Sequence, residues 1–162
     1  MKNAFDKTNA LRQVENAGIP VKPHLYDVGD GRIDGCSMAE KIGLPPERVF
    51  KTLVTVSADR EHLVFVIPVN RELDLKLAAK VAGTKKVEMI LQKELLPLTG
   101  YRHGGCSPVG MKKMFRTFID EAAAGFDDIA VSAGRIGLAM ELPVSALAEL
   151  KQAHLAKLTS GN

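Results

Sequence analysis

The sequence predicts an α+β fold, with a mixed, mostly antiparallel sheet that is curled or barrel-like and flanked by helices. Apolar, β-branched stretches come in hairpin-like pairs between short helical stretches, without the regular strand–helix alternation of a parallel sheet. With 46% hydrophobic and 25% charged residues, a chain of 162 residues can bury a core of its own. No linker or repeat divides the chain, so residues 1–162 are expected to form a single domain.

The N-terminal part of the chain predicts a helix and an edge strand. Leu11 and Val14 belong to a narrow apolar stripe at helical spacing, so we expect a helix over about residues 6–17, ended by the glycine that follows. Residues 21–26 are expected to be extended. Pro23 confines this strand to a sheet edge, because proline donates no ladder hydrogen bond.

The next part predicts a short helix and a central hairpin. Ser37 and Glu40 have the spacing of a capping box, so we expect a helix to begin there, after the glycine- and aspartate-rich loop at residues 29–35. Residues 50–57 (FKTLVTVS) are rich in β-branched residues, and residues 62–69 are apolar on both faces. Together they predict a buried hairpin at the centre of the sheet.

The second half predicts further helices and strands. Asp74 is expected to cap a helix that Gly83 ends, and Pro97 and Gly100 are expected to close a helix at residues 91–98. Strands are expected at residues 86–89, 114–119, 129–132 and 136–142. A final helix is expected to begin at Pro143 and to turn four leucines toward the core: Leu147, Leu150, Leu155 and Leu158.

Composition excludes several classes of protein. The net charge of +3 is too small for a histone-like protein, and two distant cysteines, Cys36 and Cys106, exclude a disulfide scaffold and a cysteine zinc site. The histidines show no ligand spacing, so neither a metal nor a cofactor is expected. The longest apolar run, residues 63–69, is too short to span a bilayer, and the N-terminus lacks a secretory signal. We therefore expect a cytoplasmic protein with no membrane partner.

Residues 104–110 (GGCSPVG) form the first candidate site. Three glycines and a proline in seven residues let the backbone approach a ligand closely. Free amides in such a loop can hold an anion or a developing oxyanion. The alternative is a tight connection between two strands.

Further candidates are basic residues and a thiol. Lys51 lies in mid-strand among apolar neighbours, so its ammonium either points into a pocket or lies on a solvated face. Residues 76–86 and 102–116 are basic and contain no acid, which predicts one positive face that could follow a phosphate backbone, or a solvated lysine surface. Cys106 follows His103 by three residues, so a thiol–imidazole nucleophile is another alternative, although no third orienting group is visible.

Several segments match one known family in order and spacing over about residues 5–150. They are GLPPERVFKTL at 43–53, ELDLK at 72–76, AGTKKVEM at 82–89, TGY at 99–101, GGCSPVG at 104–110 and VSAG at 131–134. With these segments the chain resembles the YbaK/EbsC family of aminoacyl-tRNA deacylases, which is similar to the editing insertion of bacterial prolyl-tRNA synthetases.

The resemblance implies hydrolysis of a mischarged aminoacyl ester on tRNA, typically cysteinyl-tRNA(Pro), as a proofreading step in trans. Backbone amides would stabilise the oxyanion, and a cysteinyl substrate's own thiol would attack its carbonyl. The expected catalytic residues are Lys51, Gly104 and Gly105. The expected substrate-binding residues are Tyr26, Thr52, Ser107, Pro108, Gly110 and Ser132. The expected partners are the aminoacylated end of tRNA and prolyl-tRNA synthetase.

The chain departs from the family pattern at two positions. The family often has an aspartate in its last strand where this chain has Ala139, and commonly an isoleucine where it has Cys106. Both changes alter the shape or polarity of the amino-acid pocket. Two alternatives therefore stay open: a catalytically silent tRNA- or synthetase-binding module, and a deacylase for another mischarged pair such as alanyl-tRNA(Pro).

Overall fold

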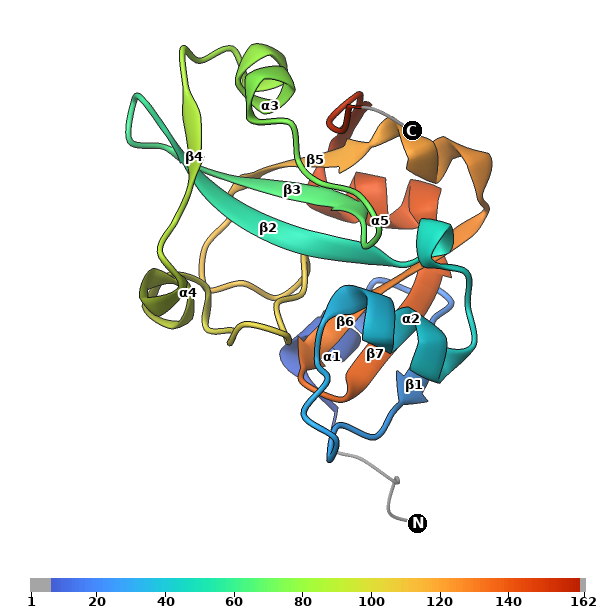
Figure 1. Ribbon diagram of the computed structural model, residues 1–162. Helices are drawn as coiled ribbons and strands as arrows, with labels where there is room; N and C mark the ends of the chain where they lie inside the picture. Colours follow the sequence, from blue (N-terminus) through green and yellow to red (C-terminus); the bar gives the residue numbers. More distant parts are fainter. Residues whose placement is uncertain (1–6, 161–162) are drawn as a thin grey trace.

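The computed structural model describes residues 7–160, shown in Figure 1. Its α-helices are α1 (Asn9–Asn16), α2 (Gly35–Ile42), α3 (Leu75–Ala82), α4 (Gln92–Thr99) and α5 (Val144–Lys151). Its strands are β1 (Lys22–Leu25), β2 (Phe50–Ser57), β3 (His62–Pro68), β4 (Val87–Met89), β5 (Arg116–Asp120), β6 (Asp128–Arg135), β7 (Leu138–Pro143) and β8 (His154–Ala156). Short 3₁₀ helices lie at Pro46–Arg48 and Glu121–Gly125.

The strands form two sheets. One has three antiparallel strands in the order β1-β7-β6, and the other has five in the order β4-β2-β3-β5-β8. In the larger sheet β4, β2 and β3 pair antiparallel, whereas β3, β5 and β8 pair parallel. A parallel bridge between Val49 and Ala130 joins the two sheets at the start of β2. The α+β class and the mostly antiparallel pairing are confirmed, and the expected curled sheet is divided in two.

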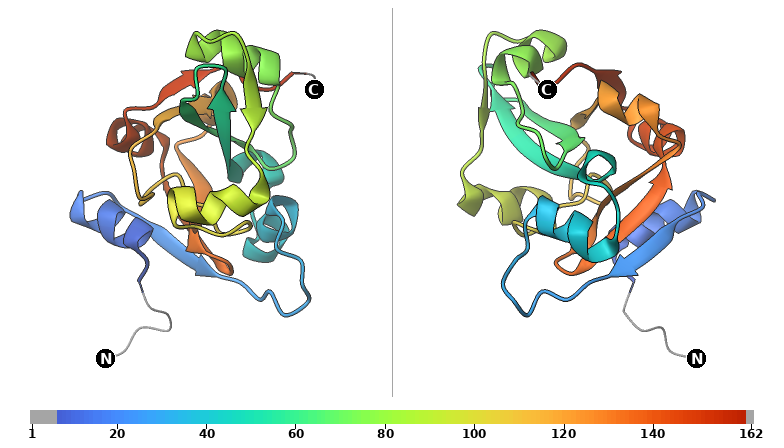
Figure 2. Two further views of the ribbon diagram at one scale, coloured as in Figure 1. Left: turned by 90° about the vertical axis from the view of Figure 1, so that its left-hand side faces the viewer. Right: turned by 45° about the vertical axis from the view of Figure 1, so that its right-hand side comes forward.

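The helices cover the sheets from several sides, and the larger sheet lies between two apolar cores. The α3 helix packs on one face, where Phe65 and Ile67 meet its alanines. The other face packs through Phe50 and Val54 against the smaller sheet, α1 and α5. A third cluster, which includes Val49, packs α2 against β6 and β7. In Figure 2, α3 and the smaller sheet occupy opposite ends of the molecule. The start of β2 thus lies where two of the three cores meet.

The strongest local signals are confirmed. The β2–β3 hairpin lies in the middle of its sheet, with Phe50 opposite Pro68 and Val56 opposite His62. Asp74 caps α3 by accepting hydrogen bonds from two amides of its first turn, and Gly83 ends that helix with φ +76°. The β1 strand lies at the edge of the smaller sheet, as its proline requires.

The predicted capping box at Ser37 is wrong. The N-cap of α2 is Asp34, whose side chain accepts a hydrogen bond from the Ser37 amide at 2.8 Å. Aspartate caps a helix as well as serine does. Because Asp34 is the N-cap, the helix begins at Gly35, ahead of the predicted cap at Ser37. The α1 helix begins at Asn9 with Thr8 as its N-cap, whereas the predicted start at residue 6 lies outside the described residues.

The predicted final helix is too long. The α5 helix ends at Lys151 because Gln152 adopts a left-handed conformation with φ 51°. The chain then turns into β8, which pairs parallel to β5 and carries Leu155 with 38% of its surface exposed. Leu158 is fully buried, but against the α3 side of the larger sheet. Strand pairing therefore overrides the helical spacing of the last leucines. In α4, Pro97 lies inside the helix and Gly100 ends it.

Candidate active site

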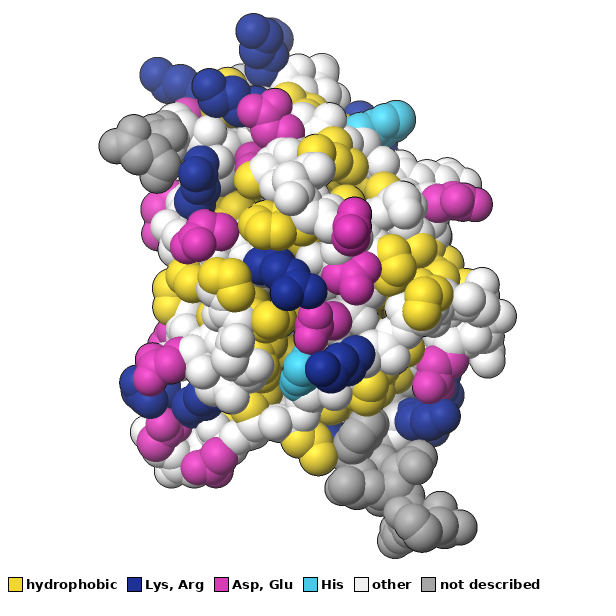
Figure 3. All heavy atoms as spheres, turned by 90° about the vertical axis from the view of Figure 1, so that its right-hand side faces the viewer, with side chains coloured by type: hydrophobic (Ala, Val, Ile, Leu, Met, Phe, Trp, Pro, Cys, Tyr) yellow, Lys and Arg dark blue, Asp and Glu magenta, His cyan; other side chains and the backbone are white. Residues whose placement is uncertain are grey.

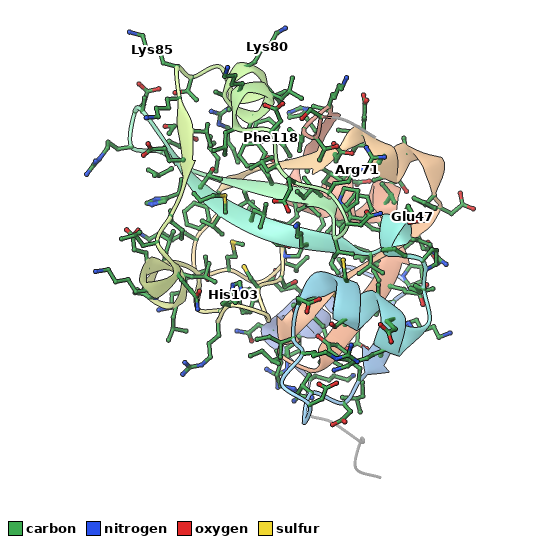
Figure 4. All side chains as sticks on the ribbon, in the orientation of Figure 1. Glu47, Arg71, Lys80, Lys85, His103 and Phe118 are labelled. Atoms are coloured by element: carbon green, nitrogen blue, oxygen red, sulfur yellow. The ribbon has the colours of Figure 1, made fainter. Side chains whose placement is uncertain are left out.

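A cavity of about 320 Å³ opens between the start of β2, the start of α2 and the loop after α4. Clefts that hold small ligands begin at about 300 Å³. The apolar part of its wall includes Met38 from α2, Phe50 from β2 and Leu95 from α4. Figure 4 labels His103 on the loop after α4, at the level of α2. The polar and charged side chains of the lining are Asp34, Lys51, Thr52, His103 and Ser132.

Lys51 is the second residue of β2 and lies half-buried in the cavity wall. Pairing of β2 with β3 fixes its backbone opposite Ile67. Within residues 7–160 its ammonium has no hydrogen-bond or ion-pair partner, and no other lysine or arginine lines the cavity. A cation that no group of the described residues 7–160 neutralises is available to an anionic group or a developing oxyanion of a ligand.

The backbone of the glycine-rich loop reaches the cavity at Gly104 and Cys106. Gly104 has φ +90°, and a Cβ atom there would lie 2.8 Å from Ile33 Cδ1, so only glycine fits. The amide of Gly105 donates to the Arg102 carbonyl oxygen at 2.9 Å and is occupied in this turn. The amides of Gly104 and Cys106 have no acceptor within the described part of the chain. These two loop amides therefore remain available to a ligand oxygen.

The rest of the loop lies behind the cavity. Ser107 is fully buried, and its Oγ accepts a hydrogen bond from the Val109 amide. Tyr101 donates its hydroxyl to the Val109 carbonyl oxygen, which fixes the end of the loop. A Cβ atom at Gly110 would lie 2.5 Å from that hydroxyl. None of Gly105, Ser107, Pro108 or Gly110 lines the cavity. The structure therefore places these four predicted residues in positions that shape the loop.

The Cys106 thiol is buried and lines the cavity. Burial raises its pKa to about 12, so the thiol is protonated near neutral pH. It makes no hydrogen bond to His103, whose side chain is exposed. This arrangement does not favour a thiolate nucleophile activated by an imidazole.

Of the other three predicted binding residues, two line the cavity and one lies behind its wall. Thr52 lines the cavity, and its Oγ1 atom is buried without a hydrogen-bond partner in the described chain. Ser132 also lines it and accepts a hydrogen bond from the Gly134 amide. Tyr26 lies behind the wall in the cluster that contains Ala139. Within residues 7–160 its buried hydroxyl makes no side-chain hydrogen bond, and burial raises the pKa of Tyr26.

Comparison with known proteins identifies the family of this chain. A family model described as the aminoacyl-tRNA editing domain matches residues 36–150 and so spans the cavity wall from Cys36 to Ser132. The chain belongs to the aminoacyl-tRNA editing domain family. This confirms the resemblance to the YbaK/EbsC proteins and the expected enzyme class, aminoacyl-tRNA deacylase.

Three relatives of the editing domain illustrate the relationship. "Putative Cys-tRNA(Pro)/Cys-tRNA(Cys) deacylase EbsC" from Enterococcus faecalis is 44% identical over 98% of this chain and 97% of its own. "Proline--tRNA ligase" from Ralstonia pickettii is 28% identical over 64% of this chain, which corresponds to 19% of the ligase. A solved structure described as "a putative trans-editing enzyme for prolyl tRNA synthetase" shares the fold, with a TM-score of 0.79 at 21% identity over 96% of this chain and 100% of that chain.

Sequence reasoning missed one charged residue of the editing domain's cavity. Among the described residues, Asp34 is the only carboxylate that lines it, and its segment appeared only as a glycine- and aspartate-rich loop. A detectable signal was present, because aspartate followed by glycine and serine is a common start of a helix. The mistaken cap at Ser37 hid that signal.

The two basic segments, residues 76–86 and 102–116, contact each other at Arg116. In Figure 4, Lys80 and Lys85 lie at the top of the view, and His103 lies well below them. Arg116 pairs with Glu61 and also donates to the Ala82 carbonyl oxygen. On the face drawn in Figure 3, acidic and basic side chains are interspersed. One positive surface formed by these two segments stays a prediction.

Two general features complete the description of the editing domain. Within residues 7–160, no three His, Cys, Asp or Glu side chains are grouped so that they could hold a metal ion. No helix in that range has the length and apolar character needed to cross a membrane.

Proposed function

We propose that this editing domain hydrolyses the ester bond of a mischarged aminoacyl-tRNA in trans, with Cys-tRNA(Pro) as its preferred substrate. The observation that carries the proposal is the unpaired ammonium of Lys51 on the wall of a cavity that also exposes the backbone of Gly104. The name of the Enterococcus faecalis relative supports the substrate class.

The lining fits a reaction that needs little help from side chains. An aminoacyl ester is already an activated acyl group, so the protein's main task is to stabilise the oxyanion that forms at the carbonyl. A donor placed at that oxygen is worth about 3 kcal/mol. The amides of Gly104 and Cys106 supply such donors, and Lys51 adds positive charge for the oxyanion or for the terminal adenosine phosphate.

The nucleophile comes from outside the protein in this mechanism. The thiol of a cysteinyl substrate attacks its own carbonyl carbon, the bond to the ribose oxygen breaks, and that oxygen takes up the proton that the thiol loses. Water then opens the resulting thiolactone and releases free cysteine. The apolar wall from Met38, Phe50 and Leu95 holds the aminoacyl group in position for this step. Positioning alone can contribute about 7–11 kcal/mol. The high pKa of the Cys106 thiol agrees with a reaction that uses no protein thiolate.

The tRNA body must be selected elsewhere, because a cavity of about 320 Å³ accommodates only the aminoacyl end. We propose prolyl-tRNA synthetase as the partner that supplies this selectivity. The similarity to a segment of the Ralstonia pickettii proline–tRNA ligase supports a link between the editing domain and that enzyme.

Replacement of Lys51 tests the proposal. We expect Lys51→Ala to lower kcat/KM for Cys-tRNA(Pro) by about 100-fold or more, the usual cost of one lost oxyanion contact, while the protein stays folded. Lys80→Ala is the matched control, since Lys80 is exposed on α3 at the far end of the molecule in Figure 4. Equal turnover by Lys51→Ala and the wild type would refute the role of Lys51.

A panel of misacylated tRNAs tests the substrate. Single-turnover deacylation is measured with Cys-tRNA(Pro), Ala-tRNA(Pro) and Cys-tRNA(Cys), with and without prolyl-tRNA synthetase. Cys-tRNA(Pro) should react fastest. Faster hydrolysis of Ala-tRNA(Pro) would assign the protein as a deacylase for alanyl-tRNA(Pro). Binding of these tRNAs without hydrolysis of any of them would identify a catalytically silent binding module.

A further inference from the structure

We infer that Asp34 binds the α-ammonium group of the aminoacyl substrate and that the cavity thereby selects esters that carry a free amino group. The inference rests on the proposed function, because it names the part of the substrate that one wall of the same cavity recognises. Asp34 is the N-cap of α2, and within residues 7–160 it is the only carboxylate that lines the cavity.

The position of Asp34 is fixed by close contacts on both sides of it. Its predecessor, Ile33, packs on Gly104, where a Cβ atom would lie 2.8 Å from Ile33 Cδ1. Its successor, Gly35, packs against the Val69 side chain so closely that a Cβ atom would collide with it. Asp34 is thus held between the glycine loop and the end of the β2–β3 hairpin. Gly104 and Asp34 line the same cavity, so an ester whose carbonyl binds at Gly104 would have its α-carbon substituents within reach of the wall that Asp34 forms.

The carboxylate remains ionised and can accept further hydrogen bonds. Its Oδ1 accepts from the Ser37 amide at 2.8 Å, and its Oδ2 accepts from the Ser37 hydroxyl at 2.9 Å. These bonds lower the pKa of Asp34, so the negative charge persists at neutral pH. Each carboxylate oxygen has a second lone pair, and no basic side chain pairs with Asp34 within residues 7–160.

The charges of the cavity match those of the proposed substrate. The end of an aminoacyl-tRNA carries a cationic amino group on one side of the ester and an anionic phosphate on the other. The lining offers one carboxylate, Asp34, and one ammonium, Lys51. Opposite charges at two points fix the direction in which the ester enters, which is how electrostatic complementarity produces specificity.

The test removes the charge on each side of the interaction. Asp34→Asn keeps the capping group, because asparagine caps a helix as well as aspartate does. Its substrate counterpart is tRNA(Pro) carrying a mercaptopropionyl ester, which keeps the thiol and the ester but lacks the amino group. Asp74→Asn is the matched control, the same change at the N-cap of α3, an eight-residue helix whose cap does not line the cavity.

We expect the wild type and Asp74→Asn to prefer the cysteinyl ester by about tenfold in kcat/KM, the factor that corresponds to about 1.4 kcal/mol. Asp34→Asn should hydrolyse the two esters at similar rates. An Asp34→Asn enzyme that keeps the wild-type preference, or that loses activity equally on both esters, overturns the inference. If Asp34→Asn is unfolded by thermal denaturation, Asp34→Ser provides the neutral cap instead. A wild type that hydrolyses neither ester would refute the proposed function rather than the role of Asp34.

Discussion

The buried hydroxyl of Thr52 leads to an unusual prediction, because its removal should stabilise the protein. Its Oγ1 atom is buried and has no hydrogen-bond partner in the described chain. Valine has nearly the same shape and lacks the hydroxyl, so Thr52→Val removes the unpaired polar group. The same strand contains a control in Thr55, which is fully buried and donates its hydroxyl to the Leu63 carbonyl oxygen at 3.0 Å.

The two substitutions are expected to change the free energy of unfolding in opposite directions. An unsatisfied buried donor or acceptor costs about 1–3 kcal/mol, so Thr52→Val should raise the free energy of unfolding by about 1 kcal/mol or more. Thr55→Val loses a satisfied hydrogen bond and should lower it by about 1 kcal/mol. For a chain of this size, 1 kcal/mol shifts Tm by about 2–4 °C.

Thermal and urea denaturation of the two variants measure these changes, and deacylation measures their effect on function. If Thr52 binds the substrate, as proposed, only Thr52→Val should lower kcat/KM, since Thr55 does not line the cavity. A Thr52→Val protein that is less stable than the wild type would refute the view that this hydroxyl lacks a partner in the folded chain.

Two other predictions concern the glycine-rich loop. Cys106→Ser should keep most of the deacylase activity. Mass spectrometry should show that iodoacetamide at neutral pH modifies the exposed Cys36 but not the buried Cys106. A 100-fold loss of activity in the folded serine variant would support the hypothesis that the Cys106 thiol is the nucleophile. Gly110→Ala should lower the free energy of unfolding by about 2 kcal/mol or more, since φ is +86° and the new Cβ would meet the Tyr101 hydroxyl. Gly18→Ala, with φ +75° and open space around it, should cost only about 1 kcal/mol in urea denaturation, so equal losses would contradict the role of the contact.

Elements specified by nearby residues were predicted well. The β2 strand matches its predicted range, since β-branched side chains favour extended backbone wherever the strand pairs. The α3 helix also matches, because its cap, its stop glycine and its apolar residues lie within one short segment. The errors arose where two local signals competed, as at Asp34 and Ser37, or where a distant strand decided the outcome, as at β8.

The site was predicted less completely than the fold. Lys51 and the glycine loop stood out as residue types, and the family resemblance added Thr52 and Ser132, which line the same cavity. Behind the wall, Tyr26 and Ser107 are buried, which their sequence positions did not reveal. Asp34 was overlooked because the helix cap was assigned to Ser37, three residues farther along the chain.

The sequence by itself determined which short segments become strands, helices and tight glycine turns, because propensities, caps and φ restrictions act within a few residues. It also carried enough ordered motifs to identify the editing family. Only the tertiary structure decided that Asp34, Lys51 and Gly104 share one cavity. Packing across the two sheets brings these residues together, and the contacts that hold them, such as Ile33 on Gly104, join segments about seventy residues apart. No local pattern encodes such contacts, because their energies depend on the assembled core.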